Sequence, residues 1–200
     1  MDTAGLRERK KRETRIALSW AAIRLTVERG LDNVRVEDIA AEAGVSLRTF
    51  RNYFSNKAEA IAARHVDRIL GIADELRARP ASEPLWEAIT NAVEAQFALG
   101  QDSGGQPPDE QWIAGVRLMM SEPALQGEMV KVGAAVEEEL AAAIAERTGS
   151  SGMYPRLVAA VVGAASAVAM GEWQRADPPR SMPSLLREAL DQLAAGLPVP

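Results

Sequence analysis

The chain contains no cysteine and only one histidine, His65, among its 200 residues. Without cysteine it can form no disulfide, no Cys/His dyad and no cysteine-based zinc site. One histidine cannot make a multi-histidine metal site, and the Gly104-Gly105 pair follows no strand that would make it a phosphate-binding loop. The sequence therefore predicts a protein that is not an enzyme and uses no metal and no cofactor.

Long apolar runs are also scarce. The longest, Leu157–Gly171, is interrupted by Ser166 and spans fifteen residues, whereas a helix needs about 20 to cross a bilayer. The N-terminus is rich in charge and lacks the apolar segment of a secretory signal. These features predict a cytoplasmic protein with no membrane partner.

The net charge of −5 is unevenly distributed. Residues 1–57 hold twelve Lys or Arg and eight Asp or Glu, a balance of +4, and the remaining residues carry −9. A basic front end on an acidic body is typical of two-part DNA-binding proteins. A merely solvated basic arm would give the same imbalance, so charge alone leaves both interpretations open.

No segment alternates apolar and polar residues as a half-buried strand would, so the sequence predicts an all-α fold. Helices are expected at about Arg7–Arg29, Val36–Ala43, Leu47–Phe54, Lys57–Arg79, Leu85–Leu99, Asp109–Ser121, Pro123–Arg147, Tyr154–Ala176 and Pro183–Ala195. A break near Gly133 is allowed within the seventh of these. The segments Gly100–Pro108 and Thr148–Met153 and the Pro-rich stretch around Pro178 are predicted linkers.

The most informative stretch is Val36–Lys57, VEDIAAEAGVSLRTFRNYFSNK. Its two short helices meet at Ala43–Ser46, a tight turn in which Gly44 can take a positive φ. Ser46 is a good N-cap for the second of them. Apolar side chains stand where a small core needs them, at Ile39, Val45 and Phe50. The pattern predicts a helix-turn-helix.

The second helix of this motif exposes Arg48, Thr49, Arg51 and Asn52 within about a turn and a half. Arg can bond guanine or phosphate, Asn can bond adenine, and Thr can bond phosphate or contact a thymine methyl. The pattern favours DNA reading. An ordinary amphipathic helix pair with a solvated face is the alternative.

Residues Arg15–Ile61 resemble the DNA-binding domain of the TetR family of bacterial repressors. The matching pieces are ERGLDNV, VEDIAAEAGVS and RTFRNYFSNKAEAI, all in register. The resemblance implies a three-helix DNA-binding domain with a basic N-terminal arm over residues 1–56 and a larger helical ligand-binding and dimerisation domain over residues 57–200. It also implies a homodimeric repressor that binds a palindromic double-stranded DNA operator and is released by a small, largely apolar effector.

Carried over by position, the resemblance assigns DNA contacts to particular residues. It places Thr49, Tyr53 and Lys57 at positions that commonly bind phosphate. Arg51 stands where relatives have an aromatic residue, and Arg35 where they usually have a capping Thr. The full set of expected DNA-binding residues is Arg35, Ser46, Leu47, Arg48, Thr49, Arg51, Asn52, Tyr53 and Lys57.

The basic segment Arg7–Arg12 precedes the motif. It is interpreted either as an arm that reaches the minor groove or nearby phosphates, or as a solubilising tail.

Two features of the body point to a dimer. Gly163, Ala167 and Gly171 are four residues apart and form a smooth ridge, and the last predicted helix carries a leucine stripe that includes Leu185 and Leu190. Paired helices from two subunits could make a four-helix bundle, and burial within one chain is the alternative.

The effector site is expected among apolar residues between this bundle and the DNA-binding domain, because Met and Trp suit adaptable apolar pockets. The expected ligand-binding residues are Trp86, Ile89, Val93, Phe97, Trp112, Val116, Met119 and Met120. Plain core packing remains the alternative for each of them, and an acyl-CoA-like effector is one possibility. A constitutive architectural DNA binder and a helical lipid- or drug-binding protein with a vestigial DNA-reading helix are the other functions considered.

Overall fold

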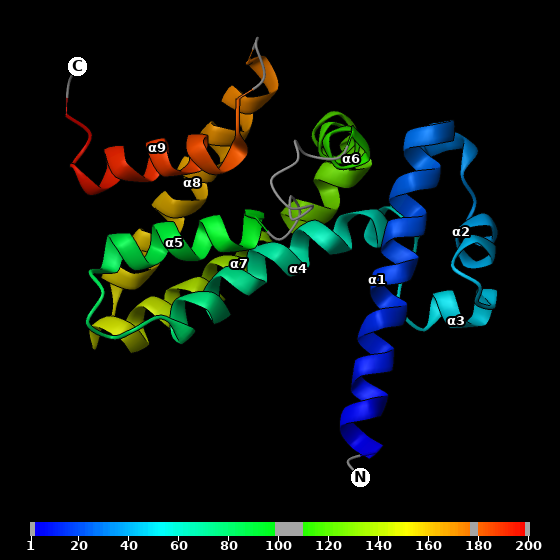
Figure 1. Cartoon of the computed structure of the whole chain (residues 1–200), viewed down its shortest axis with the longest axis horizontal. Coiled ribbons are helices and arrows are strands. Elements are labelled where there is room, and N and C mark those ends of the chain that lie inside the picture. The colour runs from blue at the N-terminus through cyan, green and yellow to red at the C-terminus, as the bar shows by residue number, and fades with distance from the viewer. Residues whose placement is uncertain (1–2, 99–109, 177–179, 199–200) are drawn as a thin grey trace. The chain divides into compact units, whose positions relative to one another are not determined.

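The computed structural model describes the backbone of residues 3–98, 110–176 and 180–198. Within these ranges the chain forms nine α-helices and one short 3-10 helix and contains no strand (Figure 1). The elements are α1 (Thr3–Arg29), η1 (Leu31–Asn33), α2 (Val36–Glu42), α3 (Leu47–Arg51), α4 (Lys57–Ala78), α5 (Leu85–Ala98), α6 (Glu110–Ser121), α7 (Pro123–Thr148), α8 (Met153–Arg175) and α9 (Met182–Ala194). The all-α prediction is confirmed.

Several helix bounds differ from those expected. α1 begins at Thr3 rather than near Arg7, and α7 runs through Gly133 without a break. α3 ends at Arg51 instead of Phe54 because the backbone N–H of Tyr53 donates to the carbonyl of Phe50 at 2.9 Å, a tighter turn than an α-helix makes. η1 was not expected at all. The predicted loop Gly100–Pro108 lies outside the described residues, as do residues 177–179 of the Pro-rich stretch.

The contacts divide the chain into two compact units. Unit 1 comprises residues 1–66 and 109–131, and unit 2 comprises residues 67–108 and 132–200. The boundary falls within α4, and the second boundary falls within α7. The predicted boundary between a DNA-binding domain (residues 1–56) and a ligand-binding domain (residues 57–200) stays a prediction. A division by contacts need not coincide with a division by function.

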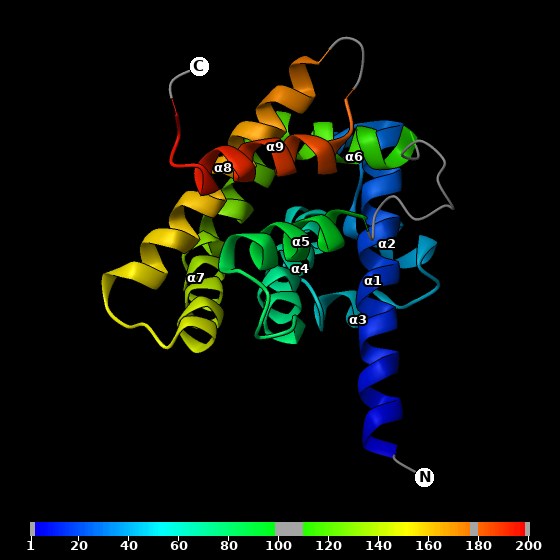
Figure 2. The same cartoon turned by 60° about the vertical axis from the view of Figure 1, so that its left-hand side comes forward.

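Unit 1 is built around a core shared by α1, α2, α3, the start of α4 and the first turn of α7. α6 packs against α1, and both views show it beside the C-terminal half of α1 (Figures 1 and 2). The buried apolar residues of this core are Leu18, Ala21, Ala22, Ile23, Leu25, Val34, Ile39, Ala40, Phe50, Phe54, Ala60, Ile61, Ala62, Ala63 and Leu125. Leu125, from α7, is fully buried although it is distant in sequence.

α1 meets the core of unit 1 through one face of apolar and small side chains. Leu18, Ala22 and Leu25 are buried, whereas Trp20 is 37% exposed. The guanidinium carbon of Arg64 lies 5.5 Å from the centre of the Trp20 ring, so a cation covers this aromatic face. The small alanines at the core positions carried too weak a hydropathy signal to define that face.

Unit 2 contains α5, α8 and α9 with the later parts of α4 and α7. α9 packs against both α5 and α8. Its strongly amphipathic sequence explains this placement, since Leu185, Leu186 and Leu190 are all buried within the unit. The leucine stripe of α9 is therefore used inside the chain, which is the alternative that the sequence left open for it.

A cluster of arginines joins the connection between α4 and α5 to α7. The Arg147 guanidinium donates to the backbone carbonyls of Pro80 at 2.6 Å and Glu83 at 2.7 Å. Arg77 pairs with Glu146 at 2.9 Å and with Glu139 at 2.7 Å. Because Arg147 satisfies carbonyls just after the end of α4, it orders a turn that would otherwise need water.

Among the described residues, α8 is long and apolar enough to cross a membrane by length and composition alone. The fifteen-residue apolar run Leu157–Gly171 lies inside this helix, which spans 23 residues. One face is buried against the rest of unit 2 through Val158, Val162 and Ala169. The packed face accounts for part of the apolar character, as in the core helix of a globular domain.

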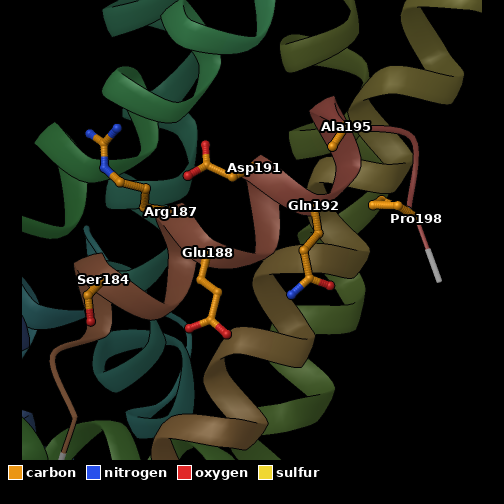
Figure 3. A pocket seen from close by; sticks show the side chains of 7 residues that line it. All are labelled: Ser184, Arg187, Glu188, Asp191, Gln192, Ala195 and Pro198. Atoms are coloured by element: carbon orange, nitrogen blue, oxygen red, sulfur yellow. The ribbon is translucent and has the colours of Figure 1, made fainter. Parts of the chain in front are cut away.

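The outward face of α9 is polar. Figure 3 shows Ser184, Arg187, Glu188, Asp191, Gln192 and Ala195 lining a shallow hollow together with Pro198. Arg187 bonds to Glu94 of α5, with Nε 2.7 Å from Oε1. This ion pair fixes α9 to α5 beside the leucine contacts.

Candidate nucleic-acid interface

The two helices of the candidate interface are α2 and α3, joined by the turn Ala43–Ser46. Gly44 has φ +68°, as expected for a turn that only glycine adopts freely. The Val45 N–H donates to the Ala40 carbonyl at 2.9 Å, which closes the turn onto α2. The helix-turn-helix read from the sequence is therefore present in unit 1.

The apolar side of this motif is fixed in the core of unit 1. Ile39 and Phe50 are buried at 0% and 1% exposure, and Val45 packs against the same cluster. Phe50 also lies 5.8 Å from Phe54, ring centre to ring centre. Because α3 has only five residues, these contacts rather than helix propensity hold it in place.

The N-terminus of α3 is capped by Ser46. Its hydroxyl oxygen accepts a hydrogen bond from the Thr49 N–H at 3.1 Å, and the two hydroxyls lie 2.9 Å apart. This confirms Ser46 as the N-cap. The Thr49 hydroxyl, expected to bind phosphate, is already bonded to Ser46, yet a hydroxyl has a further lone pair or proton to offer.

The remaining polar side chains of α3 face solvent. Arg48, Arg51 and Asn52 are exposed, whereas Leu47, Thr49 and Tyr53 are half-buried. Asn52 is the C-cap of α3 and Tyr53 follows it, so these two residues lie in the turn after α3 rather than on the helix. The exposed set can offer two guanidinium groups and one carboxamide to a nucleic acid.

Arg35 occupies the N-cap of α2 and is exposed. Its side chain makes no cap, as expected for a residue that replaces Thr. Instead, the side chain of Asp38 caps the start of the helix, because its carboxylate accepts a hydrogen bond from the Arg35 N–H at 2.9 Å. The guanidinium of Arg35 is therefore not needed to start α2.

Lys57 has an internal role that the sequence did not indicate. Its ammonium nitrogen lies 2.5 Å from the Leu31 carbonyl oxygen and 2.9 Å from that of Val34. Two of its three protons are thus used to hold η1, which leaves one proton for the expected phosphate. The phosphate contact of Lys57 stays a prediction.

The start of α4 is capped beside Lys57. The Asn56 side-chain oxygen accepts from the Glu59 N–H at 2.8 Å, and the Glu59 carboxylate accepts from the Ser55 N–H at 2.7 Å. This pair of bonds resembles a capping box, except that the Glu59 carboxylate accepts from the residue before the N-cap. It fixes the turn that carries Tyr53 and Phe54 into α4.

Sequence reasoning missed two contacts that frame this interface. Arg24 of α1 pairs with Glu42 at the end of α2. Arg15 of α1 lies over the Phe54 ring, its guanidinium carbon 5.4 Å from the ring centre. The two residues of each pair are far apart in the sequence, so no helical or strand periodicity could reveal the contact.

The expected effector residues fall on two helices that belong to different units. On α5, in unit 2, Ile89, Val93 and Phe97 are buried and Trp86 is half-buried. Ile89, Val93 and Phe97 are four residues apart and share one face of the helix. The guanidinium carbon of Arg68 lies 5.4 Å from the centre of the Phe97 ring.

On α6, in unit 1, Met120 is 37% exposed. The side chains of Trp112, Val116 and Met119 lie outside the described residues. The structure thus groups the α5 set within unit 2, and the joint effector site stays a prediction.

The ridge expected to join two subunits is exposed on α8. A Cβ atom added at Gly163 would meet nothing within 4 Å, and Ala167 is exposed. Large apolar side chains flank this ridge, with Leu157 56% and Val168 61% exposed. The described part of the chain therefore leaves an apolar face of α8 uncovered, whereas Leu185, Leu186 and Leu190 of α9 are buried.

Comparisons with known families agree with this architecture. Residues 20–63 match the family described as bacterial regulatory proteins, tetR family, and residues 83–198 match the MftR C-terminal domain. The HTH-type transcriptional regulator TcmR of Streptomyces glaucescens is 33% identical over 196 residues, which cover 94% of this chain and 86% of TcmR.

Solved structures share the fold. The fatty acid degradation regulator FadR of Bacillus halodurans superposes with a TM-score of 0.61 at 17% identity, covering 92% of this chain and 96% of FadR. Thermus thermophilus FadR, solved in complex with lauroyl-CoA, gives a TM-score of 0.56 at 17% identity over 93% of this chain and 96% of its own.

Proposed function

Because the chain belongs to the TetR family of bacterial regulatory proteins, we propose that it is a homodimeric repressor that binds a palindromic operator and is released by a small, largely apolar ligand. One observation carries the DNA-binding part. α3 exposes Arg48 and Arg51, and Asn52 at its C-cap is exposed beside them, while the N-cap and the apolar face of the helix are satisfied inside unit 1. Exposed guanidinium and carboxamide groups on a fixed helix are suited to base edges in the major groove.

The residues divide by the chemistry they can perform. Arg48, Arg51 and Asn52 read bases, because their groups can bond bidentately to guanine or adenine. Arg35, Thr49, Tyr53 and Lys57 bind phosphates and position the helix without reading sequence. Ser46 and Leu47 set the start of α3 and its distance from the DNA.

The dimer forms through the uncovered face of α8. Leu157, Gly163, Ala167 and Val168 give it an apolar ridge with a smooth centre, which lets a second α8 approach closely. A twofold axis through such an interface presents two copies of α3 in opposite orientations. The operator is then an inverted repeat whose half-sites are one helical turn, or a multiple of it, apart.

The effector binds near the apolar face of α5, at Trp86, Ile89, Val93 and Phe97. Lauroyl-CoA, the ligand of Thermus thermophilus FadR, is a reasonable first probe because its acyl chain is apolar. α4 is one continuous helix of 22 residues, about 33 Å long at 1.5 Å per residue. It begins beside the DNA-reading turn and continues into unit 2, so it can carry the effect of the ligand.

A ligand acts in this scheme by favouring a form of the dimer whose two α3 helices do not fit the operator. The repressor works in the cytoplasm, where the operator is. By reciprocity, operator DNA weakens ligand binding by the factor with which ligand weakens DNA binding.

Selection of duplexes from a random-sequence pool by the wild-type protein tests the proposal. We expect enrichment of an inverted repeat, and a decrease in its affinity when lauroyl-CoA or another apolar probe binds. Failure to enrich any duplex would contradict the DNA-binding function. Enrichment of an inverted repeat that no apolar compound in a broad screen releases would leave a constitutive DNA-binding protein.

A further inference from the structure

The N-terminal turns of α1 are a surface that the DNA-reading motif does not include. α1 starts at Thr3, but its first residue in the unit 1 core is Leu18. Residues 5–13 are all exposed. Both views show these turns continuing past α3 (Figures 1 and 2). The helix therefore extends beyond the domain that it helps to build.

Local contacts hold this extension in helical form. Arg9 pairs with Glu13 at 3.6 Å and Lys11 with Glu8 at 3.7 Å, four and three residues apart. The Thr14 hydroxyl donates to the Lys10 carbonyl at 2.9 Å. These contacts lie within the helix itself, so the extension is helical without support from the core of unit 1.

The extension is strongly basic. Residues 7–15 contain six Lys or Arg and two Glu, a net charge of +4 in a chain whose total is −5. The two glutamates are paired with Lys11 and Arg9 within the helix. Arg7, Lys11 and Arg15 are four residues apart, so they form one stripe along a single face.

Arg15 ties this stripe to the DNA-reading motif. Its guanidinium lies over Phe54, whose ring stacks near Phe50 of α3. The face of α1 that carries Arg7 and Lys11 thus points to the side on which the turn after α3 lies. Arg7 is about 12 Å along the helix axis from Arg15 at 1.5 Å per residue, which matches a rise of three to four base pairs.

The helical form decides between the two ways in which a basic arm could bind DNA. An α-helix with its side chains is about 10–12 Å across, whereas the minor groove of B-DNA is about 6 Å wide. A helix cannot enter that groove as an extended arm does. Of the two DNA contacts considered for the basic segment, the helical form therefore favours phosphates over the minor groove.

We propose that the N-terminal turns of α1 form a second DNA-binding surface, in which Arg7, Lys11 and Arg15 bind backbone phosphates of double-stranded DNA beside the site read by α3. This inference rests on the proposed DNA-binding function and adds a contact outside the helix-turn-helix. The stripe strengthens binding without reading sequence, because phosphates carry no base information. It also raises the dependence of binding on salt.

The test compares two double variants on a duplex selected by the wild-type protein from a random pool. Arg7→Gln/Lys11→Gln removes two charges from the stripe. Arg9→Gln/Arg12→Gln removes the same charge from the other side of the same turns. Glutamine is a good helix former, and circular dichroism checks that both variants keep the wild-type helix content.

The stripe variant should give a slope of log affinity against log salt that is shallower by about 1.8 per bound protomer, at about 0.9 for each lost phosphate contact. Between 50 and 200 mM salt this amounts to about a tenfold smaller loss of affinity per protomer. Hydroxyl-radical footprints should lose one group of protected sugars and keep those next to α3. The control variant should retain the wild-type slope and footprint.

Equal slopes and footprints for the stripe variant and the wild type would overturn the second surface while leaving DNA reading by α3 intact. Equal losses in both variants would also overturn it, because only the general charge of the extension would then matter. If the wild-type protein selects no duplex, the proposed function fails first, and this inference fails with it.

Discussion

The ammonium nitrogen of Lys57 lies 2.5 Å from the carbonyl oxygen of Leu31, across 26 residues of sequence. A second bond, to the carbonyl of Val34 at 2.9 Å, closes the connection between α1 and α2 onto the start of α4. A residue placed by resemblance at the DNA therefore also holds together the domain that meets the DNA. We therefore expect variants at Lys57 to change both the stability of unit 1 and its binding to DNA.

Lys57→Met should lower the free energy of unfolding by about 1.5–3 kcal/mol, because two carbonyls lose a charged donor. Urea unfolding followed by circular dichroism measures the change. Lys131→Met, on the exposed part of α7, removes the same charge without this contact and should have little effect. Wild-type stability in Lys57→Met would show that water replaces the ammonium at no cost.

The first turn of α7 should stabilise the DNA-reading unit. Leu125 is fully buried in the core of unit 1, so Leu125→Ala should cost about 2–5 kcal/mol of stability. Val130, five residues further along α7, is 80% exposed, and Val130→Ala is the matched control. Equal unfolding midpoints for the two variants would contradict the place of Leu125 in this core.

The α8 ridge offers a clean test of the dimer. Within one chain a side chain at Gly163 meets open space, so Gly163→Leu should leave the fold intact. In the dimer it should force the helices apart at a cost of about 1–3 kcal/mol or more. Sedimentation should show a shift toward monomer for Gly163→Leu and none for Gly133→Leu, whose position is equally open. A wild-type protein that is monomeric at micromolar concentration would contradict the interface.

Acid should weaken the contact at the end of α4. The Arg79 guanidinium donates to the Glu83 carboxylate at 2.5 Å and lowers the pKa of that carboxyl below its ordinary 4.5. A carboxyl whose pKa is lower in the folded state adds stability above about pH 4.5, and this stability is lost as pH falls through the folded value. Glu83→Gln should remove this part of the pH dependence of urea unfolding below about pH 5. If the free energy of unfolding changed with pH in the same way in the wild type and in Glu83→Gln, the Arg79–Glu83 pair would contribute no such pH dependence.

The sequence predicted the helices well because their ends carry local signals. Gly30 and Gly44 take the positive φ that their turns need, and Ser46 and Asn56 cap the helices that follow them. The motif that these signals outline, with buried Ile39 and Phe50 beneath exposed Arg48 and Arg51, was also predictable from residue types and spacing alone.

Contacts between distant segments could not be predicted in this way. Nothing in the local sequence says that Leu125 enters the core of α1 and α2, that Lys57 bonds to η1, or that Arg15 covers Phe54. The core face of α1 includes Ala21 and Ala22, which are buried at positions where size rather than hydropathy decides. Helix packing selects small residues there, which a hydrophobic pattern undervalues.

The central claim is that α3 reads DNA, and one equilibrium titration tests it directly. The affinity of the wild-type protein and of Arg51→Ala/Asn52→Ala is measured for a selected inverted repeat and for a scrambled duplex of the same composition, at several salt concentrations. If these side chains read bases, the double variant should lose about 1–3 kcal/mol per contact on the inverted repeat and little on the scrambled duplex. A correctly folded double variant that binds both duplexes as the wild-type protein does would contradict the account.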